Sequence, residues 1–132
     1  KIKTMKRGFF AHCICYREQI YHKHILFLNE KDEIIEITPF FNETSNTTFI
    51  DGILIVASPS FHIHLKDFIA TIKKQIENPK TRLSLAILKN PVYKNNMPNM
   101  GGRCLLCNIP EICWENERPE SFSIEINEIF RP

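Results

Sequence analysis

Two His-x-His pairs are the residues whose types and spacing could do metal chemistry. His62 and His64 end the stretch FIDGILIVASPSFHIHL, and His22 and His24 lie in QIYHKHILFL. In an extended strand, residues i and i+2 share a face, so each pair could converge on one ion. Four imidazoles from adjacent strands could hold Zn²⁺, Ni²⁺ or Cu²⁺. The alternative, which we favour, is that they are solvent-facing histidines on separate strands.

A second candidate is the cysteine series in GGRCLLCNIPEIC, where Cys104, Cys107 and Cys113 have the spacing Cys-x2-Cys-x5-Cys. Cys-x2-Cys is half of many zinc sites and needs a second half. Cys13 and Cys15 could supply that half, although Cys-x-Cys suits a zinc knuckle poorly. In an extended strand, positions 104 and 107 point to opposite faces, and free cysteine is among the most buried residue types. We therefore expect buried structural thiols, with a metal site as the alternative.

A catalytic zinc site cannot be completed around His62 and His64. Such a site takes about three protein ligands and keeps an open position for water. No histidine follows His64, and Asp67 is the only later aspartate, so ligands and a general base are both lacking. We expect no enzyme of this type and no cofactor. The alternatives are a small protein that binds zinc or another transition metal, a degenerate metal-dependent hydrolase using His-x-His, and an enzyme whose site the sequence does not reveal.

Composition limits the classes of partner. The 132 residues fit one domain, 1–132, and 43% of them are hydrophobic, enough for a core. The 17 basic and 15 acidic residues nearly balance, so we expect neither a nucleic-acid nor a membrane partner. The five cysteines are an odd number, which favours reduced thiols and a cytoplasmic location over a secreted disulfide framework.

The elements that must position these residues are mainly strands. Apolar runs predict strands over about 9–58, interrupted by the polar turn NEKDE and the loop FNETSNTT. Helical spacing predicts one helix over about 65–77, through Leu65, Phe68, Ile69, Ile72 and Ile76. Residues 82–90 fit a strand or a short helix, and closing strands are expected within about 82–130. This order predicts a mainly β (α+β) fold, a small twisted β-sandwich with one covering helix.

The text from Phe9 to Leu65 resembles the N-terminal β-domain of amidohydrolases in the metal-dependent hydrolase superfamily. The resemblance is carried by AHCICY, by NEKDEIIEI and by Gly52, ten positions before His62. The segment from about Met100 to Phe130 resembles, more weakly, the C-terminal part of the same composite domain. Two features depart from the family. Its Pro-Gly-Phe turn is replaced by Val-Ala-Ser at 56–58, and a serine stands at position 60, where it has Asp or Asn.

The resemblance implies that His62 and His64 occupy the place of the metal ligands in that family. The family's (β/α)₈ barrel takes roughly 250 residues, whereas only Leu65 to Asn99 lies between the two matching segments. The resemblance therefore implies a barrel-less, non-catalytic relative that acts in binding or assembly, as a homodimer or with a protein partner. The remaining alternative is an unrelated α+β domain.

Overall fold

The computed structural model describes residues 6–40, 46–120 and 125–126. The chain opens with an antiparallel hairpin of β1 (Arg7–Tyr16) and β2 (Gln19–Leu28), and β3 (Ile34–Pro39) pairs antiparallel with β2. The predicted mainly β, α+β class is confirmed: strands predominate and form a mixed sheet, with a few helices beside it.

The sheet has the order β3-β2-β1-β5-β6-β9, so β5 (Ile53–Ala57) lies near its centre. β1 pairs in parallel with the short β4 (Thr47–Phe49) through residues 8–10 and with β5 through residues 13–16. All five residues of β5 are buried, as expected for a continuous apolar strand covered on both faces. β6 (Leu105–Ile109) and β9 (Glu125–Ile126) continue the sheet antiparallel to β5.

The sheet curls until its two sides meet at one end. Before β6, three backbone hydrogen bonds of 3.0 Å join the two sides: Ile34 N–H donates to the Gly102 carbonyl, Gly101 N–H to the Ile34 carbonyl and Cys104 N–H to the Asp32 carbonyl. This closure encloses an inner core, formed mainly by the buried side chains of Phe9, Ala11, Ile14, Tyr16, Leu26, Leu28, Ile34, Ile50, Leu54, Val56, Cys104 and Leu106.

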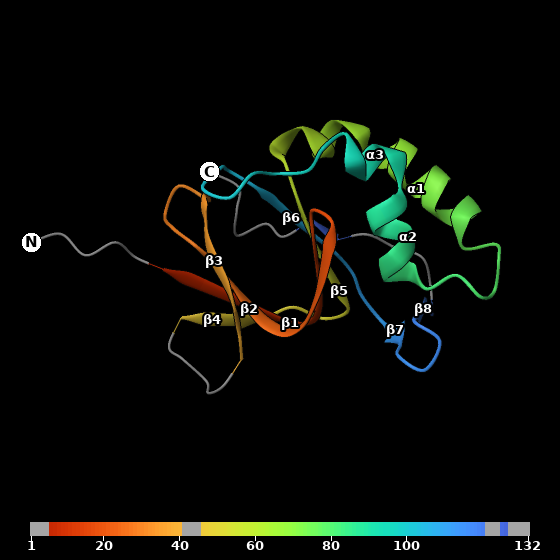
Figure 1. Ribbon diagram of the computed structural model, residues 1–132, viewed down its shortest axis with the longest axis horizontal. Coiled ribbons are helices and arrows are strands. Elements are labelled where there is room, and N and C mark those ends of the chain that lie inside the picture. Colours follow the sequence, from red (N-terminus) through yellow and green to blue (C-terminus); the bar gives the residue numbers. More distant parts are fainter. Residues whose placement is uncertain (1–5, 41–45, 121–124, 127–132) are drawn as a thin grey trace, which may run out of the picture.

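The helices lie together on one side of the sheet (Figure 1). The chain leaves β5 at Ala57 and returns at Leu105, its direct pairing partner. Between them come the 3₁₀ helix η1 (Pro59–His64), α1 (Leu65–Gln75), α2 (Leu83–Lys89) and α3 (Pro91–Lys94). Their apolar faces pack on the sheet in a second core that includes Phe61, Phe68, Ile72, Leu83 and Tyr93.

The helical layer is larger than the sequence predicted. The expected helix over 65–77 is present as α1, but residues 82–90, which fitted a strand or a helix, form α2, and α3 follows at once. The closing strands therefore begin at Leu105 and not near residue 82. α3 begins where the side chain of the buried Asn90 accepts hydrogen bonds from the backbone N–H of Val92 and Tyr93. No described helix has the length and apolarity needed to span a membrane.

A small hairpin of β7 (Ile112–Cys113) and β8 (Arg118–Pro119) lies against the helices. The Arg118 guanidinium donates hydrogen bonds to the backbone carbonyls of Ile76, Asn78 and Thr81, the last at 3.2 Å. These carbonyls belong to the segment that joins α1 to α2. The hairpin thus fixes the spacing between the two helices.

Candidate functional site

The structure places His62 and His64 in η1 and not on a strand. A 3₁₀ helix has three residues per turn, so side chains two residues apart point in directions about 120° apart around its axis. Both histidines are exposed. The geometry that would let this pair converge on one ion, the alternation of an extended strand, is absent here.

His22 and His24 lie on β2, as expected, but the strand is distorted between them. Lys23 has a positive φ of 56°, which breaks the alternation of faces. The His24 ring Nδ1 lies 2.7 Å from the carbonyl oxygen of His22, within hydrogen-bonding distance. Residues of β1 opposite His22 pair with the start of β5, whereas η1 follows the end of β5, so the two histidine pairs lie far apart. Within the described ranges, no group of three or more potential ligands is placed to hold a metal ion.

All five cysteines are free, and only Cys113 is exposed. Cys104 belongs to the inner core and Cys107 to the core under the helices, on opposite faces of the sheet. Burial raises the pKa of each of these two thiols to about 12. A hydrogen bond with Cys13, and then burial, raises the pKa of the Cys15 thiol. These thiols are therefore neutral at physiological pH, whereas metal binding and nucleophilic attack need thiolates.

Five aromatic rings meet at the surface in a continuous row, here called the aromatic band: Phe40, Phe10, Phe49, His12 and Trp114. The Phe10 ring centroid lies 4.7 Å from that of Phe40 and 5.8 Å from that of Phe49. The His12 centroid lies 5.9 Å from those of Phe49 and Trp114. These separations are typical of interacting aromatic pairs.

The band is assembled by strand pairing. Phe10 and His12 are two residues apart on β1, and Phe49 is opposite Phe10 in the parallel pairing of β4 with β1. Phe40 directly follows β3 and is held by a 3.0 Å hydrogen bond from its backbone N–H to the carbonyl of Lys23. Trp114 directly follows β7. The rings thus come from four segments that are far apart in the sequence.

Much of the band is accessible to solvent. Phe49 is 58% exposed, Trp114 41% and Phe40 36%, and these are large side chains. His12 is also exposed. Isolated exposed apolar residues are ordinary, but a contiguous exposed apolar patch marks an interaction surface. The aromatic band is therefore the candidate functional site.

The charged residues that stand next to members of the band in the sequence are mainly acidic. Asp51 lies two residues after Phe49, and Glu115 directly follows Trp114; both are exposed. The Asp51 carboxylate accepts a 3.1 Å hydrogen bond from the backbone N–H of Glu111, a third exposed acid. Lys23, whose carbonyl anchors Phe40, contributes one cation.

Sequence reasoning missed this site for identifiable reasons. Phe10 and Phe40 lie in strand-like runs that favour core positions, as Phe9 and Tyr16 do, but of these four only Phe9 and Tyr16 are buried. Trp114 with Glu115 and Glu117 could suggest a sugar site, but two glutamates two residues apart are more typical of a solvated face. Glu117 is in fact 1% exposed. The available signal was the spacing of Phe10 and His12, two residues apart in a strand.

The comparisons with known proteins add no relative. No protein-family model matches the chain, and neither a curated protein nor a solved structure is detectably similar to it. The resemblance to the amidohydrolase β-domain accordingly stays a prediction from short motifs.

Proposed function

We propose that this chain is a non-catalytic binding module that docks a partner protein through the aromatic band. The observation that carries the proposal is the meeting of five rings from four segments at an exposed surface. Aromatic side chains dominate the energetics of protein interfaces, because they bury a large area and lose little conformational freedom. Ring-to-ring contacts hold the band in place before a partner arrives, which lowers the entropic cost of binding.

The chemistry around the band favours a partner segment with apolar or aromatic side chains flanked by lysine or arginine. Asp51, Glu111 and Glu115 supply carboxylates for such flanks. A nucleic acid is a poorer candidate, since its phosphates would meet these acids. The rings also touch one another in tilted and edge-on geometries, with interplanar angles of 31° to 80° for the Phe49 contacts, and do not form a parallel stacking platform.

Docking of this kind needs no cofactor. We place the module in a reducing compartment such as the cytoplasm, because its five cysteines are unpaired and four of them are buried parts of the cores. On this proposal the four histidines of the His-x-His pairs bind no metal. The resemblance to the amidohydrolase β-domain then concerns the fold of the strands and not a catalytic site.

The test is selection of a phage-displayed random peptide library on the immobilised protein. Peptides enriched on the wild type are expected to carry aromatic or aliphatic anchors near basic residues. Their affinity should fall at least about thirtyfold for the double variant Phe49→Ser/Trp114→Ser, since the loss of even one anchor at a binding hot spot costs on the order of 2 kcal/mol. Met100→Ser is the matched control, because Met100 is 54% exposed and lies outside the band.

Two results would contradict the proposal. Peptides that bind the wild type and the double variant equally would place the binding surface elsewhere. Self-association of the wild type that the double variant abolishes, seen by sedimentation velocity, would make a second copy of this chain the occupant in place of a different protein.

A further inference from the structure

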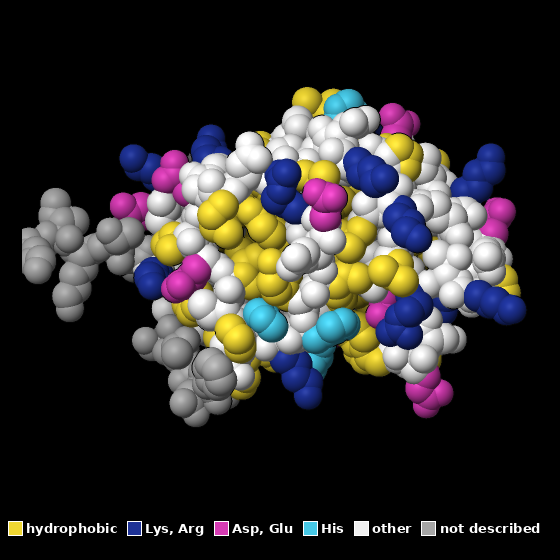
Figure 2. Space-filling view, viewed as in Figure 1, with side chains coloured by type: hydrophobic (Ala, Val, Ile, Leu, Met, Phe, Trp, Pro, Cys, Tyr) yellow, Lys and Arg dark blue, Asp and Glu magenta, His cyan; other side chains and the backbone are white. Residues whose placement is uncertain are grey.

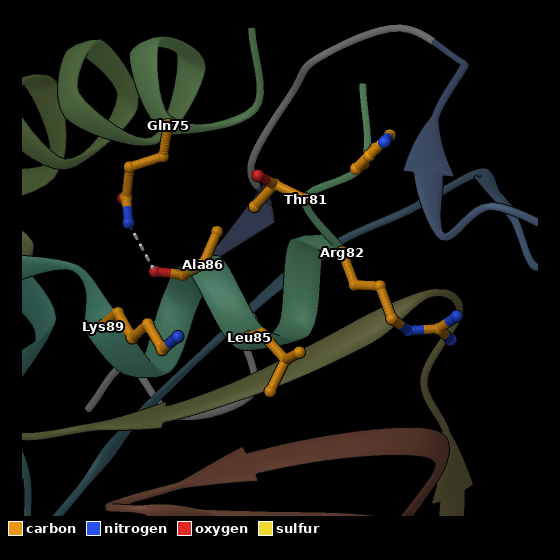
Figure 3. Close-up of a pocket in the computed structure, with 7 residues that line it drawn as sticks. Gln75, Thr81, Arg82, Leu85, Ala86 and Lys89 are labelled. Atoms are coloured by element: carbon orange, nitrogen blue, oxygen red, sulfur yellow. Dashed lines mark hydrogen bonds between the residues drawn. The ribbon is translucent and has the colours of Figure 1, made fainter. Parts of the chain in front are cut away.

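A groove of about 400 Å³ lies on the helical side of the molecule, and none of its lining residues belongs to the aromatic band. It runs between the C-terminal end of α1 and the outer surface of α2, and its walls are Gln75, Lys80, Thr81, Arg82, Leu85, Ala86 and Lys89. Figure 3 shows Lys89 and Arg82 toward opposite ends of the groove, with Leu85 and Ala86 between them. Its volume is within the range of small-molecule sites.

The ionisable side chains that line the groove are all basic: Lys80, Arg82 and Lys89. Lys80 and Lys89 are exposed, so their ammonium groups can reach a ligand. Arg82 is partly engaged, because its Nη2 lies 2.7 Å from the buried carboxylate of Glu117, but half of its side chain stays exposed. Lysine and arginine together are the usual recognition groups for phosphate.

The groove also has a fixed wall and an apolar floor. The Gln75 amide donates a 3.0 Å hydrogen bond to the Ala86 carbonyl, drawn in Figure 3, and its oxygen accepts a 2.7 Å hydrogen bond from the buried Asn90. Leu85 is 43% exposed, so its side chain offers an apolar surface inside a basic rim. A ligand that matches this site combines an anionic group with a compact apolar body.

The charge of the whole helical segment supports the same reading. Residues 59–99 contain seven Lys or Arg and two Asp or Glu, a net charge of +5, whereas the full chain carries only +2. Lysine and arginine side chains are spread over the part of the surface formed by the helices in Figure 2. A field of one sign raises the local concentration of oppositely charged ligands.

We infer that this groove is a binding site for a small organic phosphate, with the phosphate attracted by the basic side chains of the rim and the organic part resting on Leu85. The site is separate from the aromatic band and does not depend on the function proposed for that band. The proposed ligand is anionic, so it suits the basic helical segment, whereas the acidic residues near the aromatic band would repel it.

The test is titration of ¹⁵N-labelled protein with phenyl phosphate, followed by NMR. We expect saturable shifts confined to residues 75–89 and a dissociation constant of about a millimolar, the affinity expected for a ligand of this size. Inorganic phosphate, which lacks the apolar part, and benzyl alcohol, which lacks the charge, should each bind at least about fivefold more weakly.

Variants separate this site from general attraction to a basic surface. Lys80→Ala and Lys89→Ala should each weaken phenyl phosphate binding about threefold to fivefold, as expected for partly exposed charge contacts. Lys66→Ala is the matched control, because Lys66 is exposed on α1 but does not line the groove. The Phe49→Ser/Trp114→Ser variant should bind phenyl phosphate unchanged, so the two proposals can fail separately.

Three results would overturn the inference. One is the absence of saturable shifts in residues 75–89. Another is an equal loss of affinity in Lys66→Ala and Lys89→Ala, which would show attraction by net charge alone. The last is tighter binding of a single-stranded oligonucleotide than of phenyl phosphate, with neither affinity altered by Lys80→Ala or Lys89→Ala.

Discussion

Gly52 shows how one residue determines the path of the chain into the central strand. Its φ is +81°, and a Cβ atom placed on it would lie 1.9 Å from the carbonyl oxygen of Ile109. The requirement is therefore double: a left-handed backbone, and close approach of β6 to the residue that precedes β5. The same glycine supported the family resemblance by its spacing from His62, but the packing explains it without any relative.

We predict that Gly52→Ala destabilises the protein by about 3–5 kcal/mol, from backbone strain and the clash together. Gly101→Ala is the matched control. Gly101 has nearly the same φ, +84°, but no atom lies within 4 Å of its added Cβ, so only the strain of about 1 kcal/mol remains. Urea denaturation of the two variants measures the difference. An equal loss of unfolding free energy in the two variants would mean that the backbone near Ile109 moves away from the added Cβ atom without an energetic cost.

At the scale of elements, Glu117 connects the β7–β8 hairpin to the start of α2. Its buried carboxylate accepts hydrogen bonds from the Arg82 guanidinium at 2.7 Å and from the backbone N–H of Ser84 at 2.6 Å. The next residue, Arg118, donates hydrogen bonds to the carbonyl of Ile76, at the end of α1, and to that of Thr81, shortly before α2. Two adjacent side chains of opposite charge thus hold both helices at the same turn.

We predict that Glu117→Gln lowers the free energy of unfolding by about 1–3 kcal/mol, because a charge-assisted hydrogen bond to Arg82 is replaced by a neutral contact. Amide hydrogen exchange in α2 should accelerate in this variant, since the hairpin no longer holds its first turn. Glu115→Gln, an exposed change two residues away, should stay within about 0.5 kcal/mol of the wild type. A similar loss in both variants would argue against the anchoring role.

The sequence predicted local elements better than their arrangement. The strands β1, β2, β3 and β5 and the helix α1 follow from runs and periods of apolar residues, and all lie within the predicted ranges or within two residues of them. The parallel pairing of β4 with β1 does not follow, because no local pattern specifies a distant partner. The aromatic band depends on that pairing and on the reversal of faces at Lys23, so it could not be predicted.

At the scale of the whole molecule, buried thiols and phenols with a raised pKa make the free energy of unfolding depend on pH in the alkaline range. Burial raises the pKa of Cys104 and Cys107 from 9.0 to about 12, and it raises the pKa of Tyr16 and Tyr93 as well. Each group stays neutral in the folded protein at a pH where it ionises in the unfolded chain. Its contribution to stability is complete below the unfolded pKa and is lost as the pH rises toward the folded pKa.

We predict that the free energy of unfolding falls between pH 9 and pH 12, the range set by the thiol pKa values. Each thiol contributes a slope of about 1.4 kcal/mol per pH unit in that range. Urea denaturation at successive pH values measures the free energy of unfolding. Cys107→Ala should reduce its slope against pH by about 1.4 kcal/mol per pH unit, the contribution of one thiol. A pH-independent free energy up to pH 11 would show that these thiols are open to solvent.

The direct pairing of Ala57 with Leu105 has a consequence for how this protein can change. The whole helical segment leaves the sheet and re-enters it at one point, across neighbouring antiparallel strands. A tight turn could join the same two residues without altering the order of the strands. The helices with their basic groove are therefore an insertion whose two ends meet, and evolution or an engineer can exchange their outer surface while the sheet that carries the aromatic band keeps its topology.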